Sequence, residues 1–419
     1  MVLGKIELRF SSGHARQITP GRPSKSNKSA LNAKNSLNFY RETWIFSCTQ
    51  ILNISILILN EKMKQSAEPI PRRPKPAASD EADFEVDSAS DPKSVVKRLK
   101  AGEIGVVTDE WPSGLRVLSE LRRSIFKKGM ESDFQTYREE RADYSHASNR
   151  LLAPVKEGRI DLKKAPEIGW LDRLYPDVDQ FLLSVPELQG LNSSWQWYLK
   201  GIQFPVLSER VYPFYGTYFP TRFDHLILFD EWLQNYSAGK KSALDIGTGC
   251  GVLAFQMLKF GFQHVTAVDN NPNAILSVLD HLKRYDLGGK VNAIESDLFE
   301  KVDAVADLIV FNPPWLPADG DVEGLDRAIY YKEGLFERFF EESIDYLNKQ
   351  GSLVILFSNL SRKEGLGGIH PVEKEIALND RYKKVQLIRR DAEAPSKKTR
   401  RRAHRKNETV ELWELQRVS

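Results

Sequence analysis

The sequence predicts an α/β protein: a seven-stranded, mostly parallel sheet with a terminal antiparallel hairpin, preceded by a smaller N-terminal α/β region. Three observations carry this prediction. From about residue 222, apolar strand-like runs alternate with helical patterns; the last two runs have no helix between them; and residues 93–210 hold further helical and apolar segments. Such alternation is typical of a parallel sheet with helices on both faces.

Two helices are predicted near the start of the N-terminal region. "DPKSVVKRLKAG" (91–102) has Asp and Pro at its entry and Gly at its exit. "PSGLRVLSELRRSIFKKG" (112–129) places leucines at helical spacing and also ends in Gly. Residues 135–215 are rich in aromatics but lack a clear period. We therefore predict only a general α/β region over 93–210, with a role in substrate recognition.

Seven strands are predicted in the following region, 211–419. They are "SALDIG" (242–247), "HVTAVD" (264–269), "KVNAIESD" (290–297), "ADLIVFN" (306–312), "GSLVILFS" (351–358), "KKVQLIRRD" (383–391) and "TVELWELQRV" (409–418). The predicted helices fall near 223–236, 252–261, 273–286, 335–350 and 371–382. Since no helix separates the last two strands, they must form an antiparallel hairpin.

Composition excludes several protein classes. Two cysteines, Cys48 and Cys250, cannot build a disulfide framework or a cysteine-rich metal site, which suits a reducing cytoplasm. We therefore predict a cytoplasmic protein and no metal site. The apolar stretch 44–59 is shorter than a membrane span and contains five polar residues. We predict no membrane role for it.

Residues 1–92 are expected to lie outside the folded domains. Residues 1–62 carry an excess of Lys and Arg, and we expect them to be an upstream extension that precedes the native start at Met63. Residues 63–92 are rich in Pro, Ala, Ser and charge, a composition that predicts disorder.

A glycine-rich loop, "LDIGTGCGVLA", joins the first strand of the large sheet to a helix. Glycines let the backbone turn sharply and approach a ligand, and the helix start offers free N–H groups. The cofactor-binding candidates of the loop are Asp245, Gly247, Thr248, Gly249 and Gly251. Asp269 ends the second strand, where a carboxylate can bind ribose hydroxyls. Taken singly, the loop could be only a tight turn and Asp269 only a helix cap.

The spacing of these residues resembles the first motif of class I S-adenosylmethionine-dependent methyltransferases. A G-x-G-x-G loop with an acidic residue two positions ahead departs from the dinucleotide fingerprint and matches that family. The resemblance implies a Rossmann-like sheet and S-adenosyl-L-methionine as the cofactor. It also implies that Asp297, in "ESDLF", contacts the adenine amino group, although Asp297 could also be a helix cap.

"NPPW", at Asn312, Pro313, Pro314 and Trp315, resembles the fourth motif of family members that methylate a nitrogen conjugated to a planar π-system. Such a nitrogen is a poor nucleophile because its lone pair is delocalised. The Asn312 side-chain oxygen and the Pro313 carbonyl could accept its N–H hydrogens and favour the transition state, while the prolines hold both acceptors in place. Trp315 could stack on the target or simply pack in the core.

The substrate remains open between two classes. "LIVFNPPWLP" and "SDLF" resemble release-factor glutamine methyltransferases, but the usual Pro-Arg-Pro-x-Thr-Glu run is replaced by "FPTRFDH". A nucleic-acid base, RNA favoured, is our first hypothesis, and a glutamine amide of a translation factor or ribosomal protein is the alternative. A binding module without activity is a third reading, which the intact motifs disfavour. Tyr330 and Tyr331 could line the target pocket or lie on the surface.

A basic run between the last two predicted strands favours nucleic acid. It follows the carboxyl end of a parallel strand, on the edge where ligands bind, and resembles a phosphate contact. A solvated loop or a contact with an acidic protein would have the same composition. Its cations are Lys397, Lys398, Arg400, Arg401, Arg402, Arg405 and Lys406.

Overall fold

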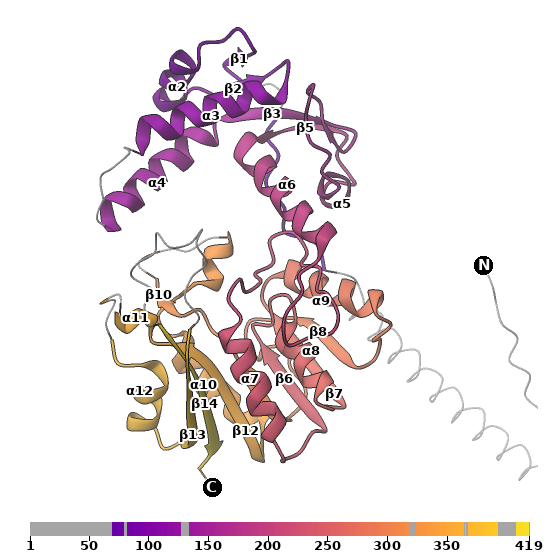
Figure 1. The fold of residues 1–419 in the computed structure, drawn as a ribbon, viewed down its shortest axis with the longest axis vertical. Helices are drawn as coiled ribbons and strands as arrows, with labels where there is room; N and C mark the ends of the chain where they lie inside the picture. Colours follow the sequence, from indigo (N-terminus) through magenta and orange to yellow (C-terminus); the bar gives the residue numbers. More distant parts are fainter. Residues whose placement is uncertain are drawn as a thin grey trace, which may run out of the picture. The chain divides into compact units, whose positions relative to one another are not determined.

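The computed structural model describes residues 69–78, 82–126, 134–318, 320, 324–363, 365, 368–392 and 408–418. They belong to one compact unit, Glu68–Ser419. The ribbon shows two larger sheets (Figure 1). One buried cluster packs the N-terminal sheet, and two others cover the faces of the large sheet. The predictions for residues 1–62, including the apolar stretch 44–59, and for the basic run 397–406 lie outside the described residues.

The large sheet has the predicted topology. Its strand order is β13-β14-β12-β9-β6-β7-β8. Strand β14 is antiparallel to both of its neighbours, and the other pairings are parallel. The predicted terminal hairpin is therefore confirmed, with its reversed strand between two parallel ones. The strands are β6 (Ser242–Ile246), β7 (His264–Asp269), β8 (Val291–Glu295), β9 (Ala306–Phe311), β12 (Leu347–Ser358), β13 (Tyr382–Asp391) and β14 (Thr409–Arg417).

Helices cover both faces of this sheet, which explains why its central strands are apolar throughout. In β9, Leu308 and Val310 join one buried cluster, whereas Ile309 and Phe311 join the cluster on the opposite face. The first face is covered by α7 (Asp224–Asn235), α8 (Val252–Lys259) and α9 (Pro272–Arg284). The second is covered by α10 (Leu335–Tyr346) and α12 (Pro371–Leu378).

Several short elements near the sheet were not predicted. Strand β12 begins at Leu347, ahead of the predicted start, because a register shift lets Leu347 pair with Ala306. Strands β10 (Leu316–Pro317) and β11 (Tyr330–Tyr331) pair with each other, and η1 (Gly324–Ala328) and α11 (Leu360–Lys363) complete the region. Such short elements depend on pairing between distant segments, which local patterns do not encode.

The N-terminal region is a five-stranded sheet packed with helices, as its predicted class requires. Asp91 caps the first predicted helix, and Gly102 ends it in the left-handed conformation. The second helix ends at Ile125, before the predicted glycine exit. The elements are β1 (Phe84–Val86), α2 (Pro92–Ala101), β2 (Gly105–Val107), α3 (Trp111–Ile125), α4 (Phe134–Ser148), β3 (Leu151–Lys156), β4 (Arg159–Ile160), α5 (Trp170–Leu174), β5 (Gln180–Ser184) and α6 (Val185–Lys200).

The prediction of disorder over 63–92 is wrong for the described part of that segment. Strand β1 pairs with β2, and Ala77 forms a bridge with Leu182. The Arg72 backbone N–H donates to Asn273 Oδ1 over 2.8 Å, and the Arg72 carbonyl accepts from Asn273 Nδ2 over 2.8 Å. A polar, proline-rich segment is therefore ordered by partners distant in sequence, which composition cannot reveal. The boundary at 210/211 stays a prediction.

In the described part of the chain, no helix has the length and apolar character needed to cross a bilayer.

Candidate functional site

A cavity of about 1220 Å³ lies at the carboxyl edge of β6, β7 and β9. The glycine loop, Asp269 and Asn312 line it from the large sheet, and Trp197 lines it from α6 of the N-terminal region. The fold therefore brings the predicted cofactor loop and the predicted target site to one cavity. Its wall also includes residues of the segment that leads into α7, from Pro213 to Pro220.

The loop glycines adopt a backbone that other residues rarely take. The φ angles are +68° at Gly247, +53° at Gly249 and +86° at Gly251. A Cβ at Gly249 would lie 3.1 Å from the Tyr218 carbonyl oxygen, and one at Gly251 would lie 2.7 Å from the Phe255 ring. Conformation thus favours glycine at all three positions, and space favours it further at Gly249 and Gly251. Gly251 caps α8 and does not line the cavity.

Asp245 holds the loop from behind and is not among the cavity-lining residues. Its Oδ2 accepts hydrogen bonds from Thr248 Oγ1 over 2.6 Å and from the Ala254 N–H over 3.0 Å. Its Oδ1 is buried and has no hydrogen-bond partner among the described residues. Burial raises the pKa of Asp245 to about 7. This carboxyl group therefore shapes the loop, whereas Thr248 itself lines the cavity.

Asp269 lies at the cavity wall and is tied to the glycine loop. Its Oδ2 accepts from the Gly249 N–H over 2.9 Å, and its Oδ1 accepts from the Asn271 N–H over 2.9 Å. Burial raises the pKa of Asp269. The cap of α9 is Asn271, so the reading of Asp269 as a helix cap is wrong. Each carboxylate oxygen keeps a second lone pair for a ligand hydroxyl.

Asp297 follows β8 and also lines the cavity, but it is exposed and paired. Arg338 Nη1 of α10 lies 3.0 Å from its Oδ2. An adenine amino group at this position would therefore meet a carboxylate that already has a cationic neighbour.

The Asn-Pro-Pro-Trp segment follows β9 directly. Asn312 and Pro314 line the cavity, whereas Pro313 is buried and Trp315 is half-buried. Trp315 packs against the cores of both sheet faces. Its indole Nε1–H donates to Asn312 Oδ1 over 3.2 Å. Trp315 is absent from the cavity lining, so in this conformation it supports Asn312 and does not face a target.

His225, in the first turn of α7, was not identified from the sequence. Its side chain is 3% exposed, it lines the cavity, and neither ring nitrogen has a hydrogen-bond partner among the described residues. Its ring meets Trp315 edge to face, with centroids 5.5 Å apart. No local signal marks this histidine, because only the packing of α7 against the loop after β9 brings it to the site.

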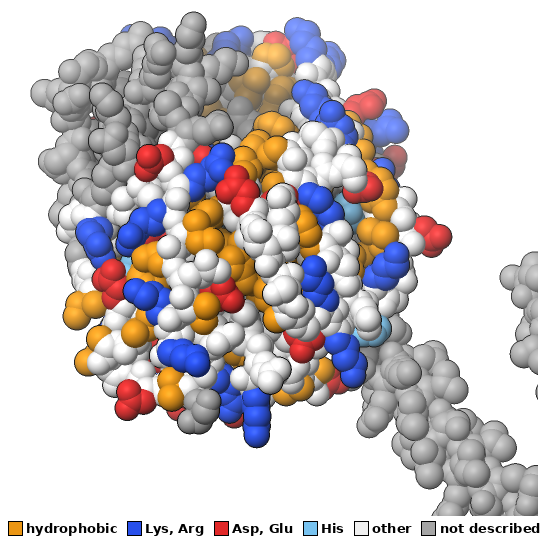
Figure 2. Space-filling view, turned by 60° about the horizontal axis from the view of Figure 1, so that its bottom comes forward, with side chains coloured by type: hydrophobic (Ala, Val, Ile, Leu, Met, Phe, Trp, Pro, Cys, Tyr) orange, Lys and Arg blue, Asp and Glu red, His pale blue; other side chains and the backbone are white. Residues whose placement is uncertain are grey.

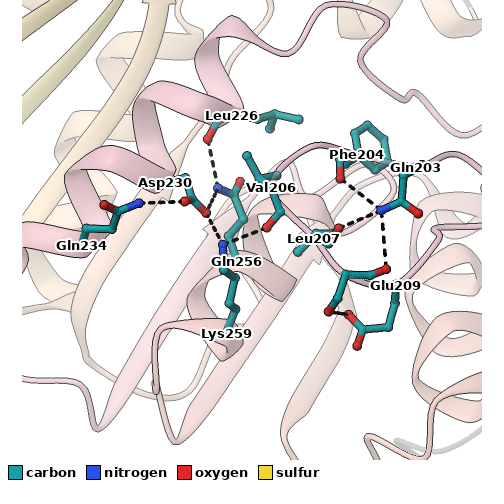
Figure 3. A network of polar contacts seen from close by, with 11 residues as sticks. Gln203, Phe204, Val206, Leu207, Glu209, Leu226, Asp230, Gln234, Gln256 and Lys259 are labelled. Atoms are coloured by element: carbon teal, nitrogen blue, oxygen red, sulfur yellow. Dashed lines mark hydrogen bonds and ion pairs between the residues drawn. The ribbon is translucent and has the colours of Figure 1, made fainter.

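A partly buried polar network fixes α7 against α8 (Figure 3). Gln256 Nε2 donates to the Leu226 carbonyl over 3.0 Å. Lys259 Nζ donates to Asp230 Oδ1 over 2.8 Å and to the Val206 carbonyl over 3.1 Å. The first turn of α7, which carries His225, is thereby attached to α8, the helix that follows the glycine loop.

Comparisons with known proteins agree with this geometry. A model of the methyltransferase small domain matches residues 227–392. A putative protein N5-glutamine methyltransferase of Methanocaldococcus jannaschii is 33% identical over 151 residues, which cover 34% of this chain and 75% of the relative. A ribosomal protein uL3 glutamine methyltransferase of Neisseria meningitidis is 29% identical over 36% of this chain and 52% of its own length. This chain thus spans about half of the uL3 relative.

Among solved structures, the ribosomal protein L11 methylase of Lactobacillus delbrueckii subsp. bulgaricus is 16% identical. The match covers 52% of this chain and 91% of that one, with a TM-score of 0.34. We base the fold assignment on the strand order and register described above.

The residues of the cavity fit S-adenosyl-L-methionine. The glycine loop leaves room for a ligand at Gly247, where an added Cβ would meet only Phe311, 3.4 Å away. Asp269 offers acceptors for ribose hydroxyls, and Asn312 stands on the same wall. The chain is an S-adenosyl-L-methionine-dependent enzyme and belongs to the methyltransferase small domain family of class I methyltransferases.

Proposed function

We propose that this enzyme transfers a methyl group to the side-chain amide nitrogen of a glutamine in a protein substrate. The observation that carries the proposal is the position of Asn312. It follows β9 at the carboxyl edge of the sheet, lines the same cavity as the glycine loop, and is held by two prolines and an indole hydrogen bond.

The chemistry follows from these positions. The bound cofactor supplies a methyl group that its sulfonium already activates. The chain must orient a planar amide nitrogen and favour the geometry in which its lone pair points at that methyl group. Asn312 Oδ1 and the Pro313 carbonyl can accept the two amide hydrogens, and both are fixed before the target arrives.

Three observations support an amide over a nucleic-acid base, the class that the sequence favoured first. The curated relatives described above are named as glutamine methyltransferases. Trp315, the expected stacking platform, lies off the cavity wall. On the face shown in Figure 2, Lys and Arg are interspersed with Asp and Glu, so no continuous basic track crosses the described residues of that face.

The substrate class is tested with labelled cofactor and cell extract. We expect the label to be released by protease and to be recovered as methylglutamine after digestion. Label that is released by nuclease instead would replace the glutamine proposal with methylation of a base.

The role of Asn312 is tested with the substitution Asn312→Ala. Because its oxygen is expected to contact the target and not the cofactor, kcat should fall about 100-fold or more while the Kd for S-adenosylhomocysteine stays within about threefold. Asp269→Asn is the opposite control: its main effect should be on cofactor affinity. Normal turnover of the Asn312→Ala enzyme would remove this asparagine from the mechanism.

A further inference from the structure

His225 is an imidazole side chain in the first turn of α7 that reaches the cavity. It is buried, it lines the cavity, and both imidazole nitrogens are without a hydrogen-bond partner in the described part of the chain. Buried polar groups in folded proteins are nearly always hydrogen-bonded, so an imidazole with two unsatisfied nitrogens points to a ligand that supplies the missing partner.

The ring lies next to the group that is proposed to hold the target. Its edge-to-face contact is with Trp315, and the indole of Trp315 donates to Asn312 Oδ1. Asn312 and His225 both line the cavity, one from the end of β9 and the other from the start of α7. A planar amide bound at Asn312 would therefore have His225 on a neighbouring wall.

Methylation of an amide nitrogen creates a need that Asn312 cannot meet. When the nitrogen attacks the methyl carbon, it acquires the positive charge that the sulfonium loses, and one of its protons must leave. Amide and carbonyl oxygens are weak bases and only accept a hydrogen bond. One lone pair of Asn312 Oδ1 already accepts a hydrogen bond from the Trp315 indole N–H. The proton must therefore pass to another acceptor, and a basic nitrogen at the cavity would take it directly.

Resting on the proposed N-methyl transfer, we propose that His225 receives the proton that the target nitrogen releases. The carbon–nitrogen bond forms as the carbon–sulfur bond breaks, and the electron pair of that bond stays on sulfur. The N–H electron pair returns to nitrogen as the proton moves to an imidazole nitrogen. His225 then passes the proton to solvent through the cavity. The products are a neutral methylated amide, a neutral thioether and one proton.

The surroundings keep His225 ready to accept. Burial lowers its pKa to about 4, with Asp224 raising the pKa and Arg222 lowering it further. The imidazole is therefore neutral near pH 7, and a methylated amide cation is acidic enough to give it a proton. Two residues of the loop after β9 lie near His225: Asn312 lines the same cavity, and Trp315 contacts the imidazole ring edge to face. Both are uncharged.

The three carboxylates among the described residues of the cavity wall are engaged elsewhere. Asp297 pairs with Arg338 of α10. Asp269 accepts two backbone N–H groups. Glu187 accepts from Ser184 in the capping box of α6. Within the described residues, no second histidine lines the cavity. His281 is also buried, and its Nδ1 has no hydrogen-bond partner in the described part of the chain. It stacks on Phe255 and does not line the cavity, which makes it a matched control.

The test compares His225→Phe, His225→Gln and His281→Phe with the wild type in single-turnover methyl transfer at saturating cofactor. Both His225 variants should lose about 100-fold or more in rate, a typical contribution of general base catalysis. Gln keeps a hydrogen-bond acceptor without a basic nitrogen, so its loss separates proton transfer from simple binding. His281→Phe should retain the wild-type rate.

Two further readouts separate catalysis from folding. The Kd for S-adenosylhomocysteine should be unchanged in each His225 variant. A third variant, His225→Ala, leaves space in the cavity for a free imidazole molecule. Added imidazole should restore methyl transfer by this variant in proportion to the imidazole concentration. A rate in His225→Gln within about threefold of wild type, or a loss in His225→Ala that imidazole cannot restore, would overturn the role of His225.

The proposed function fails on a different result, the identity of the labelled atom. If the wild-type enzyme labels a base, the glutamine proposal falls, and the same variants are then compared on that base. The His225 result is thus independent of which nitrogen is methylated.

Discussion

At the scale of single residues, the hydrogen bond from Trp315 to Asn312 changes the meaning of the Asn-Pro-Pro-Trp motif. The sequence allowed the tryptophan to stack on a target or to pack in the core. The structure places it in the core with its one polar atom on the asparagine oxygen. Its contribution is then orientation, because a fixed acceptor costs less ordering during the reaction.

This view predicts the effect of Trp315→Phe. The variant keeps an aromatic ring but cannot donate to Asn312, whose side chain gains freedom. We expect kcat to fall by about tenfold with little change in KM, the value of one neutral hydrogen bond. Trp197→Phe, on the α6 wall of the cavity, is the control: it also removes an indole N–H, but one that does not donate to Asn312. Its kcat in steady-state kinetics should change less than that of Trp315→Phe. A rise in KM at constant kcat would show instead that Trp315 binds the target.

The predicted site residues that the structure places at the cavity share one property: each belongs to a motif of a few consecutive residues. Gly247, Gly249 and Asn312 are of this kind. Reasoning missed His225 and the contact of Arg72 with Asn273, because both depend on segments that meet only in the folded chain. It assigned Asp245 to cofactor binding, whereas the carboxyl group lies behind the loop, since spacing fixes the order of residues but not the direction of a side chain.

At the scale of elements, α7 and α8 behave as one support for the cavity. The network around Gln256 and Asp230 ties the first turn of α7, with His225, to α8, the helix that Gly251 caps (Figure 3). Periodicity predicted both helices. It could not predict this attachment, because Gln256 reads as an ordinary polar residue in a helix and is fully buried.

Gln256→Leu tests this support. The change keeps the side-chain volume but removes the donor to the Leu226 carbonyl. We expect the free energy of unfolding to fall by about 1–3 kcal/mol, because buried polar groups lose their partner. Urea denaturation measures the effect. Gln234→Ala, at the exposed end of the same network, should change stability by less than about 0.5 kcal/mol. Equal losses in both variants would contradict a special role for the buried amide.

At the scale of the whole molecule, buried ionisable groups set a pH dependence of stability. Asp245 has a pKa of about 7 in the folded state, above its ordinary value of 3.8. Between these values the folded state holds a proton that the unfolded state has released. The contribution of Asp245 therefore lowers stability as the pH rises from about 4 to 7. Burial lowers the pKa of His225 and His281 to about 4, and these groups act in the opposite direction.

Asp245→Asn isolates the first contribution. The asparagine oxygen can keep the hydrogen bonds from Thr248 and Ala254, but the side chain no longer titrates. Relative to wild type, the variant should gain stability between pH 5 and pH 8, by up to about 1.4 kcal/mol for each unit of pKa difference. The histidine contributions cancel because both proteins contain them. Urea midpoints at the two pH values measure this gain. Parallel pH profiles would show that Asp245 is ionised in the fold throughout this range.

The position of β14 in the sheet means that the sheet can be completed only at the end of synthesis. A ribosome makes β12 and β13 before β14, yet β14 lies between them and supplies their hydrogen bonds. Until residue 417 is translated, the nascent chain presents the bare edge of β12, a surface that invites mispairing and chaperone capture. A nonsense codon ahead of β14 would therefore disrupt the sheet, since it removes an interior strand and not the rim.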